Sequence, residues 1–293
     1  MHTNKGAEDF KILQCTHETI NEWKDFVPAK NEVLIGGLIF LKDWVLRTEI
    51  SDALGKVFVR NVKTNKEEQL IFADEKVISP SISLMQKNKD TDAIRIGYES
   101  PKTPARIYEY NLKTKDKKLV KEQEVPSGHD RNDYIVERLN CPSHDGRQIP
   151  ITVTYHKKTK LDGNAHVLLY GYGSYGSSMT PTFSTSRFSL INRNVIWATC
   201  HIRGGLERGM SWWREGKMLN KKNTFSDFLS CAKFLIEKKY TSKKKLIAFG
   251  GSAGGLLVSN IVNQAPELFL GSIMAVPFCD NLTTNLDHSL PLT

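Results

Sequence analysis

Between about residues 35 and 155, hydrophobic and polar positions alternate over short segments that are separated by turn residues. Val, Ile, Tyr and Phe are concentrated in four of these segments, Ile39–Ile50, Lys56–Val62, Ala93–Tyr98 and Arg106–Leu112. A period of two is typical of strands with one buried face. No long helical pattern interrupts them, so the region is predicted to consist of short β-strands.

A weak internal repeat runs through the same region. The sequence NVKTNK at 61–66 recurs fifty positions later as NLKTKD at 111–116, and the preceding segments 45–51 and 94–100 repeat at nearly the same interval. A period of about 40 to 50 residues built from hairpins is typical of β-propeller blades. About two blades fit in this length, whereas a closed propeller needs four or more. Residues 1–145 are therefore predicted to be an incomplete set of propeller blades.

From about residue 148 the pattern changes to strands that alternate with helices. Apolar runs of buried-strand length lie at 167–170, 195–199, 245–249 and 272–276. Apolar residues at helical spacing lie between them at 224–236, with Thr224 as a plausible N-cap and Asp227 in the first turn, and a second helix is expected from Ala253 to about Asn263. This alternation predicts an α/β domain over 146–293, with a mostly parallel sheet and helices on both faces.

The segment GGSAG at 250–254 lies at the junction between the strand 245–249 and the helix that follows it. It matches G-x-S-x-G, in which the serine occupies a sharp, strained turn and glycines remove side chains that would collide with the neighbouring strand and helix. Such a turn raises the serine hydroxyl above the sheet at a helix N-terminus, where developing negative charge is stabilised. Ser252 is therefore predicted to be a catalytic nucleophile, the alternative being a glycine-rich turn that caps a helix.

A second motif, YGYGSYG at 170–176, follows directly after the strand 167–170. It lies where the carboxyl end of a strand meets the rim expected to hold the active site. Glycines allow the backbone to approach a substrate closely, and a tyrosine hydroxyl can donate a hydrogen bond to an oxyanion. A tight turn with packing aromatic residues is the alternative interpretation, and the spacing by itself favours neither.

Composition excludes few classes of function. The net charge of +9 could indicate an anionic partner, but the lysines are spread along the chain, which favours a solvated surface over a nucleic-acid site. Five scattered cysteines without CxxC spacing indicate buried reduced thiols and predict neither a disulfide framework nor a metal site. No apolar stretch reaches the roughly 18 to 20 residues of a membrane span, and the first ten residues lack the core of a signal peptide. A cytoplasmic protein without membrane contact and without a cofactor is expected.

The region from Tyr170 to Thr293 resembles the catalytic domain of the prolyl oligopeptidase family, and most resembles its oligopeptidase B branch. The resemblance depends on six ordered signatures: YGYGSYG (170–176), FSTSRFSLINR (183–193), HIRGG (201–205), GKMLNKKNTFSDF (216–228), GGSAGGLLVS (250–259) and PFCDNLTT (277–284). It implies an α/β-hydrolase domain preceded by the final blades of a seven-bladed propeller, which covers the catalytic site and restricts access to short peptides.

The resemblance also implies roles for individual residues. Ser252 matches the family nucleophile, the Ala253 amide one oxyanion donor, and Tyr172 the tyrosine whose hydroxyl is the second donor. Tyr175 falls where an aromatic residue lines the pocket for the residue before the scissile bond. Thr180 and Thr182 stand where the oligopeptidase B branch has acidic residues that recognise basic side chains, which weakens a dibasic preference.

A serine hydrolase of this fold needs an Asp and a His after the serine. Only Asp280, Asp287 and His288 follow Ser252 with suitable side chains, and family spacing places the true pair beyond residue 293. His201, which precedes the nucleophile, is expected to belong to the scaffold. The chain is therefore expected to be truncated at both ends and inactive alone, although its family cleaves short peptides after Arg or Lys. A same-fold esterase or acyl-peptide hydrolase, and a non-catalytic fragment that needs a partner chain to supply the missing residues, remain alternatives.

Overall fold

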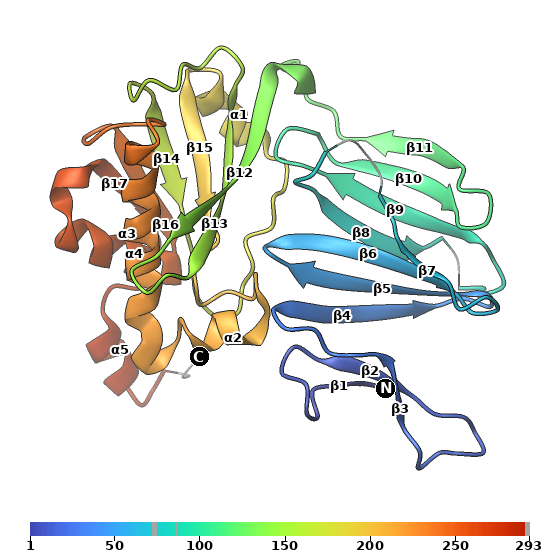
Figure 1. The fold of residues 1–293 in the computed structure, drawn as a ribbon. Coiled ribbons are helices and arrows are strands. Elements are labelled where there is room, and N and C mark those ends of the chain that lie inside the picture. Colours follow the sequence, from blue (N-terminus) through green and yellow to red (C-terminus); the bar gives the residue numbers. More distant parts are fainter. Residues whose placement is uncertain (72–74, 86, 291–293) are drawn as a thin grey trace.

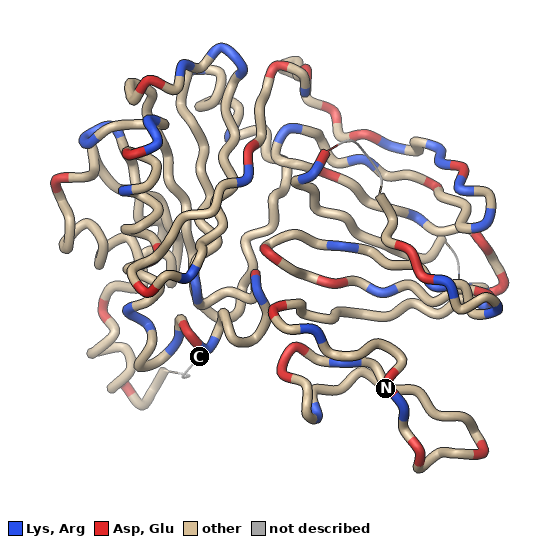
Figure 2. The backbone as a smooth tube through the Cα atoms, in the orientation of Figure 1, with Lys and Arg blue, Asp and Glu red and all other residues tan. Residues whose placement is uncertain are grey.

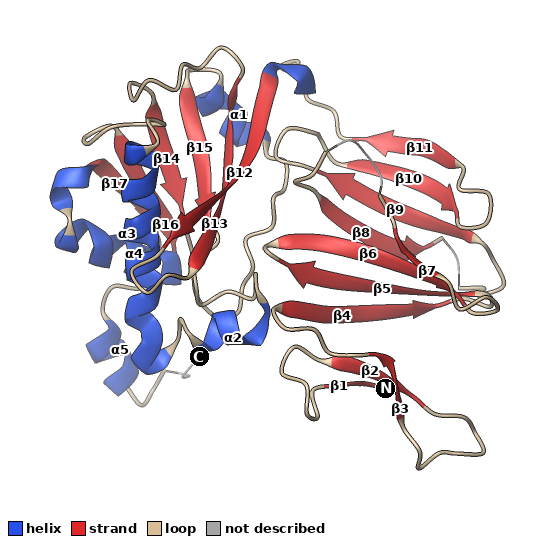
Figure 3. Ribbon diagram, in the orientation of Figure 1, coloured by secondary structure: helices blue, strands red, loops and turns tan. Residues whose placement is uncertain are grey.

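The computed structural model describes residues 1–71, 75–85 and 87–290 of the chain. Two parts of different construction lie side by side (Figure 1). One part contains β-strands up to β11, and the other combines a sheet with all the described α-helices (Figure 3). The β-propeller and α/β-hydrolase architecture predicted from the sequence is present in this order along the chain.

Two four-stranded antiparallel sheets form most of the first part, and each is a meander of consecutive strands. The first contains β4 Val33–Phe40, β5 Trp44–Ser51, β6 Leu54–Asn61 and β7 Glu67–Gln69. The second contains β8 Ser79–Leu84, β9 Ala93–Glu99, β10 Arg106–Asn111 and β11 Lys117–Glu122. Alternating residues from both sheets, including Leu46 and Ile96, share one buried cluster. The two sheets are thus the two blades expected from the repeat.

The sequence repeat corresponds to equivalent turns in the two blades. Asn61 and Asn111 each end the third strand of a blade, and each side-chain oxygen accepts from the backbone N–H groups two and three residues later at 2.9 to 3.0 Å. Asparagine favours such turns because its side chain bonds its own backbone. The repeated segments 45–51 and 94–100 are likewise the second strands β5 and β9.

Two details of this part differ from the sequence prediction. The segment Ile39–Ile50 spans a turn and contributes to both β4 and β5, because Leu41 N–H donates to Trp44 O and the chain reverses there. A further three-stranded sheet, which the pattern did not predict, contains β1 His2–Thr3, β2 Lys11–Gln14 and β3 Lys24–Val27. Its strands have two to four residues, and only Ile12 and Val27 in them are buried, so they are too short to show a strong period of two.

The second part contains one six-stranded sheet in the order β12-β13-β15-β14-β16-β17. Its strands are β12 Tyr134–Pro142, β13 Gln148–His156, β14 His166–Tyr170, β15 Val195–Cys200, β16 Leu246–Gly251 and β17 Phe269–Ala275. β15, β14, β16 and β17 are mutually parallel, whereas β12 and β13 are antiparallel additions. The expected mostly parallel sheet is therefore present.

Helices cover both faces of this sheet. They are α1 Thr185–Ile191, α2 Gly209–Arg214, α3 Lys221–Glu237, α4 Ala253–Gln264 and α5 Asn281–Leu286, with short 3-10 turns η1 Arg131–Asp133, η2 Met218–Asn220 and η3 Pro266–Leu268. Phe228 of α3 and Leu257 of α4 are fully buried in the main core with Ile196 of β15. On the opposite face, Phe188 of α1 packs in a separate cluster that includes Trp197.

The six-stranded sheet begins before the predicted domain boundary between residues 145 and 146. That boundary falls in the turn between β12 and β13, which pair along their whole length from Tyr134↔His156 to Pro142↔Gln148. β12 joins the α/β part because its cross-strand partner is β13, although its alternating pattern resembles that of the blades. The sequence pattern could not distinguish the two sheets at this point.

The helix predicted from Thr224 begins three residues earlier, and Thr224 is not its N-cap. α3 starts at Lys221, and Thr224 is buried inside it, where its hydroxyl donates to Arg203 O at 2.9 Å. Asp227 lies beyond the first turn of α3, so it is not placed to interact with the N-terminal end of the helix dipole. It forms a buried ion pair with Arg203, with Nη2–Oδ1 at 2.7 Å and Nε–Oδ2 at 2.9 Å.

Contacts between the two parts involve the tight turn after β5. Ala53 N–H donates to Glu207 O at 2.8 Å, and Asp52 accepts from the Arg208 guanidinium at 2.6 Å. Nearby, Asp9 accepts from Met210 N–H at 2.6 Å. The loop from Leu206 into α2 is therefore joined to the β-strand part of the molecule by hydrogen bonds and by an ion pair.

Surface features are consistent with scattered charge. Figure 2 shows Lys and Arg positions over both parts of the molecule, with Asp and Glu positions between them. Cys141, Cys200 and Cys231 are buried as expected, but Cys15 is half-buried and Cys279 is exposed. Within the described ranges, no helix has the length and apolar character needed to cross a membrane.

Candidate active site

Ser252 lies in a strained turn between β16 and α4. Its φ of 53° and ψ of −118° lie in a region that non-glycine residues rarely occupy, and its position immediately precedes the first residue of α4. The backbone is held there because Ser252 N–H donates to Ala275 O at 2.9 Å and its carbonyl accepts from Gly255 N–H at 2.8 Å. The residue itself is exposed. This is the strand-turn-helix geometry that was predicted for a nucleophile.

The glycines around Ser252 are required by close backbone contacts. A Cβ on Gly250 would lie 2.2 Å from Gly254 O, and a Cβ on Gly255 would lie 2.5 Å from Pro277. Real Cβ atoms do not approach backbone atoms so closely. The turn can therefore form only if these positions lack side chains, which is the reason for the glycine spacing in the motif.

Ala253 is the first residue of α4 and is nearly fully buried. The first N–H groups of a helix have no intrahelical partner, and the helix dipole places partial positive charge there. An oxyanion formed next to Ser252 would meet this end of α4. The geometry is thus compatible with the predicted role of the Ala253 amide.

The YGYGSYG turn lies directly against this helix. A Cβ on Gly254 would lie 2.9 Å from Gly171 O and 3.4 Å from the ring of Tyr172, so the first turn of α4 and the aromatic turn are in contact. Gly171 in turn packs against Phe228 and Leu257, where a side chain would not fit. The fold therefore brings together Ser252, Ala253 and Tyr172, which come from two segments about eighty positions apart.

Tyr175 occupies a different position in the same turn. It has a φ of 56° and its side chain is 62% exposed, so among the described residues it does not line an enclosed pocket. Its role next to the scissile bond stays a prediction. Thr180 is exposed and Thr182 is half-buried, with Thr182 O accepting from the Arg187 guanidinium at 2.7 Å.

His201, Asp280 and His288 do not approach the nucleophile through hydrogen bonds. His201 is fully buried and bonds to Thr152 Oγ1 at 2.8 Å, as expected for a scaffold residue. Asp280 caps α5 by accepting from Thr283 N–H at 2.9 Å, and His288 is exposed. Over the described part of the chain, no side chain hydrogen-bonds to Ser252 Oγ.

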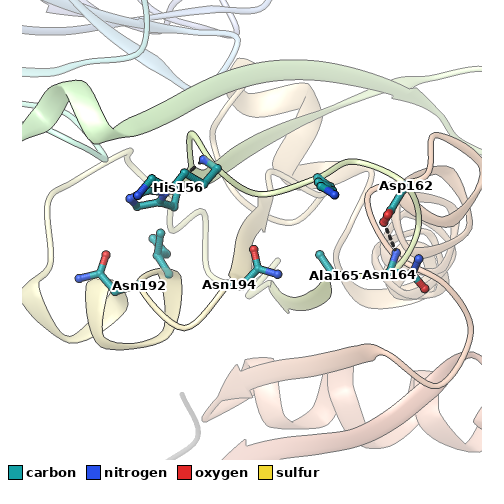
Figure 4. A pocket seen from close by; sticks show the side chains of 9 residues that line it. His156, Asp162, Asn164, Ala165, Asn192 and Asn194 are labelled. Atoms are coloured by element: carbon teal, nitrogen blue, oxygen red, sulfur yellow. Dashed lines mark hydrogen bonds between the residues drawn. The ribbon is translucent and has the colours of Figure 1, made fainter.

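A polar pocket lies at the other end of the parallel strands. It borders the amino ends of β14 and β15, and its lining includes His156, Asp162, Asn192 and Asn194 (Figure 4). The catalytic residues of open α/β sheets lie outside the carboxyl ends of the strands. The candidate active site is therefore the one at Ser252 and not this pocket.

Glu207 is a buried carboxyl that no sequence motif singles out. Its side chain is 1% exposed, Oε1 accepts from Met179 N–H at 2.9 Å, and Oε2 has no hydrogen-bond partner. Burial raises the pKa of Glu207 to about 7, partly offset by the bond from Met179. The raised pKa means that the folded protein prefers the neutral acid.

This pKa predicts how stability depends on pH. The carboxyl of Glu207 titrates near its ordinary pKa of about 4.3 when unfolded but near 7 when folded. The stability that the neutral Glu207 carboxyl gives the folded state is therefore fully present below about pH 4.3. It is lost as the pH rises through the folded pKa of about 7. The loss is about 3 kcal/mol. The Gln side chain of Glu207→Gln cannot ionise. As the pH rises from 4.5 to 8, the free energy of unfolding of this variant should therefore increase relative to that of the parent by up to about 3 kcal/mol.

Urea unfolding of parent and variant at several pH values measures this difference. Glu237→Gln is the matched control, because Glu237 is exposed at the end of α3. A difference between Glu207→Gln and the parent that stays constant with pH would contradict the prediction.

Comparisons with known proteins agree with the two-part architecture. The family model described as the prolyl oligopeptidase family matches residues 181–293, and the model of the prolyl oligopeptidase N-terminal β-propeller domain matches residues 1–123. The boundary between the two matches lies in the same region as the start of the six-stranded sheet.

Similar curated proteins match nearly the whole chain. Dipeptidyl aminopeptidase BI of Pseudoxanthomonas mexicana is 40% identical over 98% of this chain and 40% of its own length. Protease 2 of Moraxella lacunata is 37% identical over 99% of this chain and 42% of its own length. The chain thus spans about two-fifths of the length of these relatives.

Solved structures show the same likeness in three dimensions. Oligopeptidase B from Trypanosoma brucei, in a closed form with covalently bound antipain, superimposes with a TM-score of 0.90 at 32% identity and covers all of this chain and 42% of its own. Oligopeptidase B from Leishmania major gives a TM-score of 0.89 at the same identity and the same coverage.

Proposed function

This chain belongs to the prolyl oligopeptidase family, and we propose from that premise that it carries the nucleophile of a serine peptidase that hydrolyses short peptides through an acyl-enzyme on Ser252. The observation that carries this proposal is the exposed Ser252 at φ 53°, placed between a parallel strand and the N-terminus of α4. Such a turn presents the hydroxyl to a substrate and places helix N–H groups where an oxyanion forms.

Three residues each have one role in the proposed reaction. Ser252 Oγ attacks the scissile carbonyl, and the tetrahedral oxyanion that forms is stabilised by the Ala253 N–H and the Tyr172 hydroxyl. The contact of the aromatic turn with Gly254 supports this arrangement, because it holds Tyr172 at the helix end that Ser252 precedes. Collapse of the intermediate breaks the scissile C–N bond, and the amine leaves with the proton that the general base took from the Ser252 hydroxyl. An ester remains on Ser252, which water then hydrolyses.

The proposed substrate class is that of the oligopeptidase B branch, with cleavage after Arg or Lys. A preference for a second basic residue is not proposed. Thr180 and Thr182 supply no carboxylate, and the cationic Arg187 bonds to the Thr182 carbonyl. A cation at this position would repel a basic substrate side chain.

The general base of the reaction is proposed to come from a polypeptide that supplies an Asp and a His. Without an aligned imidazole the serine hydroxyl keeps its high pKa and is a poor nucleophile. Among the residues that the structure describes, none hydrogen-bonds to Ser252 Oγ, and the nearest candidates in sequence are engaged or exposed elsewhere. A polypeptide segment that brings an Asp and a His to Ser252 would meet this need.

The purified 293-residue chain alone is expected not to turn over peptides. The measurement is hydrolysis of an N-terminally blocked, arginine-containing fluorogenic peptide by the chain and by its Ser252→Ala variant, each with and without a polypeptide that carries the Asp and His. Turnover is expected only in the combination that contains Ser252. Robust turnover by the chain alone that disappears in Ser252→Ala would instead show that an in-chain base such as His288 completes the site.

The same assay separates the alternative functions. An esterase or acyl-peptide hydrolase would cleave ester or acylated substrates and leave the blocked arginine peptide intact. A dipeptidyl aminopeptidase, the activity named for one relative, would require a free N-terminus on the substrate. A non-catalytic binding module would show no Ser252-dependent hydrolysis of any of these substrates in either preparation.

A further inference from the structure

The turn of residues 170–176, here called the aromatic turn, is held at its two ends by the sheet and its connections. Gly171 N–H donates to Phe249 O of β16 at 3.2 Å. Gly176 N–H donates to Gly204 O at 2.9 Å, in the loop that follows β15. These bonds fix where the turn leaves the sheet and where it returns, and they do not restrain the residues between.

Lys221 contacts the middle of the aromatic turn. Its Nζ donates to Gly173 O at 2.6 Å and to Ser174 Oγ at 2.7 Å. Lys221 is the first residue of α3, so its backbone belongs to a long helix that is packed into the main core. The side chain thus links a rigid element to the two residues that follow Tyr172.

This lysine lacks a carboxylate partner. Within the described ranges Lys221 forms no ion pair, and both of its acceptors are uncharged. Burial lowers the pKa of Lys221 to about 8. Lys221 is half-buried. Removing an ammonium from water without a counter-charge costs free energy, and groups of this kind cluster at functional sites. Structural ion pairing does not explain its position.

The segment that Lys221 holds has little room to move in other directions. A Cβ on Gly173 would lie 2.4 Å from the Thr224 methyl group and 2.9 Å from Ile202, and a Cβ on Gly204 would lie 1.9 Å from Gly173 O. Gly173 is therefore enclosed by α3 and by the loop after β15. The hydrogen bond from Lys221 selects one orientation of the Gly173 carbonyl within this space.

We propose that Lys221 is a positioning residue that fixes Gly173 and Ser174 and thereby orients Tyr172 toward the oxyanion of the reaction. The inference rests on the proposed function, because Tyr172 needs an oxyanion to stabilise. The Gly173 carbonyl that Lys221 holds belongs to the Gly173–Ser174 peptide plane. Tyr172 directly precedes Gly173, so this plane is one residue from Tyr172 and limits how far its backbone can move. Displacements of about 1 Å in such groups lower rates by ~10²-fold.

The first test is amide hydrogen exchange on the full 293-residue chain, which does not depend on activity. In Lys221→Met the amides of residues 171–176 should exchange roughly 10- to 100-fold faster, the factor that corresponds to a hydrogen bond from a charged donor. The matched control is Lys222→Met, because Lys222 is exposed at the next position of α3. It should leave exchange in the aromatic turn unchanged. Unchanged exchange in Lys221→Met, or equal acceleration throughout α3 and the sheet, would overturn the proposal.

A second variant keeps the test decisive if Lys221→Met does not fold. Ser174→Ala removes one of the two acceptors and retains the lysine. It should accelerate exchange in the aromatic turn by a smaller factor than the lysine variant, without affecting the sheet. Protection equal to that of the parent in Ser174→Ala would then refute the link between Lys221 and the turn.

The kinetic test uses the active combination of this chain with the polypeptide that supplies the base. Lys221→Met should lower kcat roughly 10- to 100-fold with KM changed by less than about threefold. A residue with a purely structural role would not separate kcat from KM in this way. Faster exchange in the aromatic turn with unaltered kcat would reject the catalytic part of the inference. If the parent itself shows no Ser252-dependent hydrolysis, the proposed function fails, and hydrogen exchange still decides whether Lys221 holds the turn.

Discussion

Ser252→Ala is expected to abolish covalent labelling by a fluorophosphonate probe in every preparation that hydrolyses peptides. The probe phosphonylates the serine hydroxyl, and alanine has no oxygen to react. Loss of the nucleophile in a serine peptidase lowers kcat by roughly 10⁶-fold, because the acyl-enzyme can no longer form. This is the largest effect expected from any single substitution in the chain.

Ser259→Ala is the matched control for this experiment. Ser259 lies two turns further along α4, and its hydroxyl donates to Leu256 O at 3.0 Å within the helix. Labelling and turnover should stay close to those of the parent. Labelling at full strength in Ser252→Ala would show that another residue reacts with the probe, and the assignment of Ser252 would have to be withdrawn.

Tyr172→Phe is expected to lower kcat by ~10²–10³, or roughly 2.7–4 kcal/mol of transition-state stabilisation. The substitution removes only the hydroxyl, and the ring keeps its contact with the first turn of α4. Because the oxyanion exists in the transition state and not in the bound substrate, KM should change little. Steady-state kinetics with the arginine peptide measure both constants.

Tyr170→Phe provides the comparison for Tyr172. Tyr170 is in the same turn, but its ring packs on the other face of the sheet against Trp197 and Phe249, with centroid distances of 6.2 and 5.2 Å. Its hydroxyl is not assigned to the oxyanion, so the rate should stay near that of the parent. A rate for Tyr172→Phe within about threefold of the parent would reject the oxyanion role.

Some of the fold could be read from local patterns. The repeat around Asn61 and Asn111 predicted two equivalent blades, because the asparagine turn is formed by residues two and three positions away. The sharp turn at Ser252 was predicted for the same kind of reason. Gly250 and Gly254 contact each other within five residues, so the requirement for glycine is visible in the local sequence.

Other features were misjudged where the deciding partner is distant in sequence. Thr224 and Asp227 look like residues of a helix N-terminus, but their hydrogen-bond partner is Arg203, which comes from the loop after β15. β12 has the alternation of a blade strand and belongs to the α/β sheet because it pairs with β13. Neither partner could be chosen from the periodicity of the segment itself.

Lys221 shows the same limit at the candidate site. In the sequence it is one of two adjacent lysines at a helix end, the position where solvated lysines are common. Only the packing of α3 against the aromatic turn distinguishes Lys221, which points inward to Gly173, from the exposed Lys222. Glu207 likewise became notable only once the loop before α2 buried its carboxyl without a cation bonded to it.

By itself, the sequence of this protein determined the types of most of its elements, the two-blade repeat and the sharp turn at Ser252, because these depend on side-chain period and on backbone constraints within a few residues. The tertiary structure alone decided that the aromatic turn packs against the first turn of α4, that Arg203 pairs with Asp227, and that Lys221 faces the aromatic turn. These contacts join segments separated by about twenty to eighty residues. These contacts stabilise the protein only when the order of strands in the sheet brings the segments together and removes water from between them. No local sequence pattern specifies that order.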